Sequence, residues 1–221
     1  MKHPVHLGKL VAALAGVVAL LGVAACAGGF HSDAPATQVY VLRAGAGAQT
    51  QLPRASAPEF SIHVTRPLAG PGLGSDHIML VQSDHRMSYY AASRWPASVP
   101  EVVEALAVET LRTSGNWSAV QDSAGGFSSD YLLQIVIQRF EADYSSHPDA
   151  PEVHVVLDCT LGRGVGRELV GTFVAEGAAT ASVNHLTEVI SAFEAAASQA
   201  LRSMALQAAQ KSEAPVASRN R

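Results

Sequence analysis

Residues 130–141, DYLLQIVIQRFE, carry the pattern that most restricts what this chain can fold into. Apolar residues at every second position define one face, made of Tyr131, Leu133, Ile135 and Ile137. The positions between them define a second face, made of Leu132, Gln134, Val136, Gln138 and Phe140. Side chains on a strand alternate between two faces, so this period of two predicts a β-strand and therefore a sheet.

A second alternating segment, residues 152–161, contains Cys159. Its apolar face consists of Val153, Val155, Leu157, Cys159 and Leu161. A cysteine can be a catalytic thiol or a small buried hydrophobe, and a position in the apolar register of a strand favours the second. We therefore expect Cys159 to lie in the core.

The remaining periodic segments predict an α+β domain. Shorter strands are expected at residues 39–42, 60–66, 78–82, 87–92, 117–120 and 168–176. A helix is expected over 99–113, where Ser98 and Glu101 form a capping box, and a second over 183–209, where apolar residues recur at helical spacing. An apolar helical stripe needs a sheet face to cover, so we expect a single domain with a largely antiparallel sheet and two helices packed on one face.

The first 26 residues have the layout of a secretory signal. Lys2 and Lys9 precede an apolar run over residues 10–21, and small residues follow. The run is shorter than the roughly 20 residues of a membrane span, although a retained anchor and an ordinary cleaved signal remain alternatives. Val23, Ala24, Ala25 and Cys26 resemble a bacterial lipobox, in which Cys26 would be acylated. Ala27 is not the aspartate of inner-membrane retention signals, which favours the outer membrane.

These features divide the chain into four parts. We expect a lipoprotein signal peptide over 1–25, a lipidated flexible tether over 26–38, a folded domain over 39–210 and a disordered tail over 211–221. The formal net charge of the whole chain is −4, and removal of the two lysines of the signal makes the remainder more acidic. A nucleic-acid-binding protein would show a basic patch, so nucleic acid is not an expected partner.

Three sequence features suggest chemistry and each has a simpler interpretation. The triplet Ser-Asp-His occurs at 75–77 and again at 83–85, but neighbours on a strand point to opposite faces, and both triplets suit strand entries or turns. The glycine-rich stretch 162–168 lacks the Gly-Lys-Ser/Thr ending of a phosphate loop and fits a hairpin turn. The nine histidines include no pair with zincin spacing, so no metal site, cofactor or catalytic residue is expected.

A family resemblance is carried by short motifs spread over residues 40–209. After the lipobox come Tyr40-Val41-Leu42, the segment 64–68 (VTRPL), the segment 75–80 (SDHIML), Met87-Ser88-Tyr89-Tyr90, Arg94-Trp95, the segment 114–117 (SGNW), the segment 130–133 (DYLL) and Phe140-Glu141. A long alanine-rich helix closes the domain. In this order the motifs make the chain similar to the ABC-type transport auxiliary lipoprotein family, which accompanies MCE-type lipid transporters.

The resemblance implies a non-enzymatic component at the periplasmic face of the outer membrane. Its implied partners are an MCE-family periplasmic protein and an inner-membrane ABC permease and ATPase, and its implied role is to dock or cap the lipid conduit. Exposed strand edges add a homo-oligomer as a further expectation. Two alternatives stay open, namely another structural or assembly lipoprotein of the outer membrane and a lipid hydrolase.

Overall fold

The computed structural model describes residues 36–43, 45, 58–146 and 149–213. The chain separates into two units, Met1–Ala36 and Thr37–Arg221, and all helices and strands described below belong to the second. The signal peptide and the lipobox therefore lie outside the described residues.

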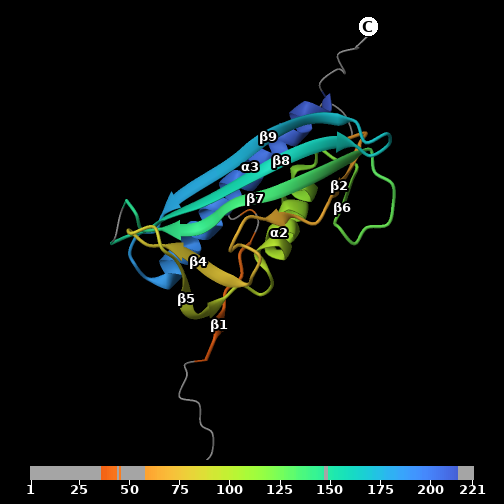
Figure 1. The fold of residues 1–221 in the computed structure, drawn as a ribbon. Helices are drawn as coiled ribbons and strands as arrows, with labels where there is room; N and C mark the ends of the chain where they lie inside the picture. Colours follow the sequence, from red (N-terminus) through yellow and green to blue (C-terminus); the bar gives the residue numbers. More distant parts are fainter. Residues whose placement is uncertain (1–35, 44, 46–57, 147–148, 214–221) are drawn as a thin grey trace, which may run out of the picture. The chain divides into compact units, whose positions relative to one another are not determined.

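Strand β7 (Tyr131–Asp143) organises a nine-stranded sheet. One edge of β7 pairs antiparallel with β8 (Glu152–Arg163), which in turn pairs antiparallel with β9 (Leu169–Thr180). The other edge is occupied in succession by β2 (Ser61–Val64), β3 (Leu68–Ala69) and β4 (His77–Val81), all parallel to β7. These three short strands run in one direction because the chain advances along the edge of β7 without turning back (Figure 1).

Three peripheral strands complete the sheet. β5 (Met87–Arg94) forms an antiparallel hairpin with β4, and β1 (Gln38–Val39) lies parallel to the end of β5. β6 (Ala119–Gln121) lies parallel to β2. The predicted α+β domain is confirmed, and its sheet is mixed. The pairs β7–β8, β8–β9 and β4–β5 are antiparallel, and the other pairs are parallel. The two-residue strand β3 lies between the expected strands 60–66 and 78–82, where no strand was expected.

A β-bulge in β7 changes which face its last residues occupy. The register with β8 shifts between Ile137 and Arg139, so one extra residue is accommodated there. As a result Phe140 lies on the helix-covered face and is buried, instead of sharing a face with Leu132 as the simple alternation predicted.

Helix α2 (Val99–Ser114) begins and ends close to the predicted positions. Ser98 is its N-cap and Gly115, with φ 67°, is its left-handed C-cap. The predicted capping box is not formed, because the side chain of Ser98 makes no capping bond and Glu101 pairs with Arg66. The first N–H group of helix α2 is satisfied by a backbone bond instead of a side-chain cap. The Val99 N–H donates to the carbonyl oxygen of Ser75 at 3.0 Å.

Helix α3 (Leu186–Glu213) crosses β9, β8 and β7 and also contacts α2, so both helices cover one face of the sheet, as predicted (Figure 1). Its buried face is rich in alanine, which lets the helix approach the strands closely. The core between the layers includes an aromatic cluster of Trp95, Phe140 and Phe193, with ring centroids 5.2–5.8 Å apart. The helix includes residues 211–213, which the sequence analysis assigned to the tail.

Candidate interaction surfaces

The first Ser-Asp-His triplet joins β4 to the start of α2. The Nδ1 atom of His77 lies 3.3 Å from an Asp76 oxygen. Alternation along a strand predicted that these two side chains point apart, but Ser75 and Asp76 precede the strand, so the alternation does not apply to them. The Ser75 hydroxyl accepts a long bond of 3.4 Å from the backbone N–H of His77, and no bond joins it to the imidazole. The carbonyl oxygen of Asp76 accepts from the Trp95 N–H at 2.8 Å. The triplet thus satisfies backbone groups, as expected for a strand entry.

The second triplet forms the turn of the β4–β5 hairpin. His85 has a positive φ of 62°, and its N–H donates to the carbonyl oxygen of Gln82 at 2.9 Å. The Asp84 carboxylate accepts from the backbone N–H and the Nε of Arg86, at 3.2 and 2.6 Å. The backbone bond from Arg86 is the main cause that lowers the pKa of Asp84. The predicted hairpin turn is confirmed, and its polar side chains serve the turn.

Cys159 and the glycine-rich stretch also have the structural roles expected of them. Cys159 is 1% exposed, and burial together with the neighbouring Asp158 carboxylate raises the pKa of its thiol to about 12. A thiol that stays protonated at neutral pH is a poor nucleophile. Residues 162–168 comprise the end of β8 and the turn to β9, which is closed by a bond of 2.8 Å from the Arg163 N–H to the carbonyl oxygen of Glu168.

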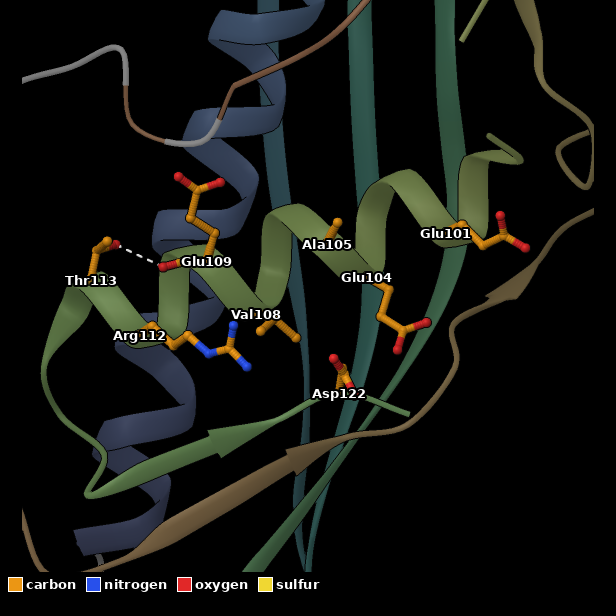
Figure 2. Close-up of a pocket in the computed structure, with 8 residues that line it drawn as sticks. All are labelled: Glu101, Glu104, Ala105, Val108, Glu109, Arg112, Thr113 and Asp122. Carbon is orange, nitrogen blue, oxygen red and sulfur yellow. Dashed lines mark hydrogen bonds between the residues drawn. The ribbon is translucent and has the colours of Figure 1, made fainter. Parts of the chain in front are cut away.

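A groove that the sequence analysis did not predict runs along the outer side of α2 (Figure 2). Its volume is about 640 Å³, and its lining consists of Glu101, Glu104, Ala105, Val108, Glu109, Arg112, Thr113 and Asp122. The carboxylates of Glu104 and Asp122 point toward one another across it (Figure 2). The spacing of acidic residues along one side of the helix could have indicated this surface.

The charged groups of the groove mainly fasten the segment after α2 to the helix. A Glu104 oxygen accepts from the Ser123 N–H at 2.7 Å, and Arg112 donates to the carbonyl oxygen of Val120 at 3.1 and 3.4 Å. At one end Arg66 pairs with Glu101. These contacts give the groove a structural explanation, and its lining has no nucleophile paired with a base.

The second surface that the structure adds is the face of the sheet opposite the helices. The register brings Leu68, Val136, Asp158 and Val174 into one row across β3, β7, β8 and β9. Leu68 is 66% and Val174 47% exposed. Gln138, at the bulge, donates to Asp158 at 2.7 Å, which ties β7 to β8 on this face. This face therefore presents both apolar and polar side chains.

The described part of the chain has neither a cluster of metal-ligating side chains nor a helix able to span a membrane. Within residues 36–43, 45, 58–146 and 149–213, no three His, Cys, Asp or Glu side chains are grouped closely enough to hold a metal ion. In the same part of the chain, no helix has the length and apolar character needed to cross a bilayer.

The sequence profile described as "ABC-type transport auxiliary lipoprotein component" matches residues 40–209. The chain belongs to this family. The match begins directly after β1 and ends within α3, so it covers essentially the whole folded domain. The resemblance stated from the sequence motifs is thereby confirmed, and the protein is an auxiliary lipoprotein component of an ABC-type transport system.

Solved structures agree with the fold. A protein from Xanthomonas campestris has a TM-score of 0.63 at 22% identity, covering 80% of this chain and 95% of that one. A protein from Chlamydia trachomatis has a TM-score of 0.51 at 4% identity, covering 69% of this chain and 97% of that one. Identities this low establish the shared fold alone. No curated protein sequence is similar enough to this chain to count as a match.

Proposed function

We propose that this auxiliary lipoprotein is anchored in the outer membrane by acyl chains on Cys26 and acts in the periplasm as a non-enzymatic partner of an MCE-type lipid transport system. In this role it docks or caps the end of the conduit formed by an MCE-family protein, which connects to an inner-membrane ABC permease and ATPase. The observation that carries the proposal is the family match over residues 40–209, together with the lipobox at residues 23–26.

The proposed anchor is tested by exchanging each of the two cysteines. Cys26→Ala is expected to leave the precursor unprocessed or unacylated, with a changed mature mass and loss from the outer-membrane fraction. Cys159→Ala is the matched control. Cys159 lies in the core, so this variant is expected to keep the mass added by acylation and the wild-type fractionation, apart from the loss of one sulfur atom. A mature mass that differs from the wild type only by the substitution itself, with unchanged fractionation, would show that the protein is not held by a lipid on Cys26.

The proposed partners are tested by co-purification from detergent-solubilised envelopes. Tagged wild-type protein is expected to recover MCE, permease and ATPase components, and Cys26→Ala is expected to recover much less of them. Sedimentation of the purified protein measures whether it also forms a homo-oligomer. Failure to recover any transport component, with the protein correctly placed in the membrane, would contradict the conduit role.

The alternative of a lipid hydrolase has a direct test in the two Ser-Asp-His triplets. Ser75 bonds a backbone N–H instead of the His77 imidazole, and Asp84 and His85 serve a turn. The combined variant Ser75→Ala, His77→Ala, Ser83→Ala and His85→Ala is therefore expected to keep full function in the cell. Loss of function, with the folded protein still present at the normal level, would favour a hydrolase.

A further inference from the structure

Two loops at one end of the sheet present strongly exposed apolar side chains. Phe127, in the loop between β6 and β7, and Val165, in the turn between β8 and β9, are each 83% exposed. Leu169, at the start of β9, is 63% exposed. We call Phe127, Val165 and Leu169 the apolar tip. No other large hydrophobic side chain of the described residues is as exposed as the first two.

The two loops are packed directly against each other, which places the members of the tip together. The N–H of Gly164 donates to the carbonyl oxygen of Asp130 at 2.8 Å. A Cβ atom at Gly164 would lie 1.8 Å from the carbonyl oxygen of Ser129, so only glycine permits this approach. Figure 1 shows the β6–β7 loop beside the β8–β9 turn, at the same end of the long strands.

Phe127 is held in its exposed position by the side chain of Gln121. The Phe127 N–H donates to the amide oxygen of Gln121 at 3.2 Å, and the amide nitrogen of Gln121 donates to the Phe127 carbonyl oxygen at 3.3 Å. The same nitrogen lies 2.7 Å from the Ser129 hydroxyl. The exposed phenyl ring therefore belongs to a loop with defined internal hydrogen bonds. Its exposure is not explained by a lack of structure in the loop.

Cationic side chains flank the tip. Arg163 and Arg167 lie on either side of Val165, and the Arg163 guanidinium stands 5.3 Å from the centre of the Tyr131 ring. Two carboxylates lie nearby. The Asp130 carboxylate accepts from the N–H and hydroxyl of Ser61, both at 2.7 Å, and also interacts electrostatically with Arg163, and Glu168 precedes Leu169. Two guanidinium groups beside exposed apolar side chains match the phosphates and acyl chains of a bilayer surface.

We propose that the apolar tip is a second membrane contact, which inserts Phe127 and Val165 into the headgroup region of a phospholipid bilayer while Arg163 and Arg167 lie at the level of the phosphates. A chain of ten residues between Cys26 and the folded unit spans at most about 35 Å, and a strand as long as β7 spans about 43 Å. Because this reach is shorter than that strand, the tip contacts the bilayer that would hold the anchor when the long strands lie inclined toward the lipid surface. A second contact would fix the orientation of the domain on the lipid surface.

The experiment uses the mature chain with Cys26→Ser, which carries no acyl group. The whole described core lies within the compact unit Thr37–Arg221, so this chain keeps the fold. Its flotation is measured with vesicles of phosphatidylethanolamine and a minority of phosphatidylglycerol, and with vesicles of phosphatidylcholine alone. We expect flotation with the first vesicles, and a loss of at least tenfold in the bound fraction for the double variant Phe127→Ser and Val165→Ser.

The matched control is Met87→Ser with Val183→Ser. Both residues are exposed, 50% each, but Met87 begins β5 and Val183 precedes α3, at the other end of the long strands. This pair is expected to float as the wild type does. Arg163→Gln with Arg167→Gln is expected to weaken flotation with the phosphatidylglycerol vesicles and to leave any binding to phosphatidylcholine unchanged. Circular dichroism confirms that each variant is folded.

Three outcomes would overturn the proposal: wild type that floats with neither kind of vesicle, a tip variant that floats as well as the wild type, or an equal loss in the control pair. If the tip variant loses co-purification with transport components while the wild type never floats, the tip is a protein contact. The vesicles contain no transport protein and the chain has no acyl group, so failure here leaves the conduit role untouched.

Discussion

At the scale of single residues, Gly177 on β9 marks the closest approach between the sheet and α3. A Cβ atom at this position would lie 2.0 Å from the Ala196 carbonyl oxygen and 2.8 Å from the Ala200 nitrogen. Both obstacles belong to the helix backbone and cannot rotate away. We therefore expect Gly177→Ala to lower the free energy of unfolding by about 3 kcal/mol, the upper part of the range for overpacked cores, as measured by urea denaturation.

Gly126→Ala is the control for this prediction. A Cβ atom at Gly126 meets nothing within 4 Å, so the change is expected to stay within about 0.5 kcal/mol of the wild type. If Gly177→Ala proved as stable as Gly126→Ala, α3 could not lie as close to β9 as described.

Asp130 gives a prediction on the pH dependence of stability. Its carboxylate accepts bonds from the hydroxyl and the N–H of Ser61, and these bonds lower its pKa in the folded protein. A depressed carboxyl pKa contributes stability above the unfolded pKa, near 3.9, and the contribution is lost as the pH falls through the folded pKa.

The variant Asp130→Asn measures this contribution. The stability difference between wild type and Asp130→Asn is expected to be constant near neutral pH and to shrink below about pH 4. The side chain is largely exposed, so the difference is expected to be small, below about 1 kcal/mol. Denaturant unfolding at a series of pH values checks it, and a difference independent of pH would contradict the assigned bonds.

At the scale of elements, β9 shows how the edge of the sheet is closed. β9 pairs only with β8, so the backbone groups of its other edge need other partners. Two glutamines of α3 supply partners for two backbone groups of β9. Gln207 donates to the carbonyl oxygen of Val174 at 2.9 Å, and the Ala178 N–H donates to Gln199 at 3.3 Å. The helix thus blocks the addition of a further strand along this edge.

We expect the double variant Gln199→Ala and Gln207→Ala to open this edge. Each lost bond is expected to cost about 1 kcal/mol, and self-association is expected to rise with concentration because backbone groups become available to a second strand. Light scattering coupled to size exclusion measures the association. Gln210→Ala, which removes an exposed glutamine from the same helix, is the control, and equal association in both variants would show that Gln199 and Gln207 do not protect the edge.

The elements that could be predicted from the sequence are those whose periodicity is long. β7, β8, β9 and both helices lie within a few residues of their predicted bounds, because alternation and helical spacing over ten residues or more reflect burial directly. The bulge before Arg139 could not be predicted, since an extra residue is visible only against the register of β8. The two-residue β3 was missed for a related reason, as its pairing is set by β7 and not by its own composition.

At the scale of the whole molecule, the surfaces were less predictable than the core. The hairpin turn at residues 162–168 was predicted, but its packing on Ser129 joins segments more than thirty residues apart. The groove along α2 likewise depends on Asp122, which follows β6. A contact between distant segments leaves no periodic trace in either of them, so the apolar tip becomes visible only once the fold has brought its loops together.

The division of the chain into Met1–Ala36 and Thr37–Arg221 predicts that anchoring and folding are separable. Every core residue of the described chain lies in the second unit, the first of them being Leu42, which is 6% exposed. A chain that begins at Thr37 is therefore expected to keep the unfolding free energy of the mature protein within about 0.5 kcal/mol, while losing its membrane anchor.

A chain that begins at Pro58 provides the contrast. It lacks β1, the buried Leu42 side chain and the bond of 2.9 Å from the Tyr40 N–H to the Arg94 carbonyl oxygen. Loss of a buried leucine alone costs about 3 kcal/mol, so this chain is expected to unfold at clearly lower urea concentration than the chain from Thr37. Equal stability of the two chains would mean that β1 and Leu42 do not belong to the folded core, and that the folded unit begins only at β2.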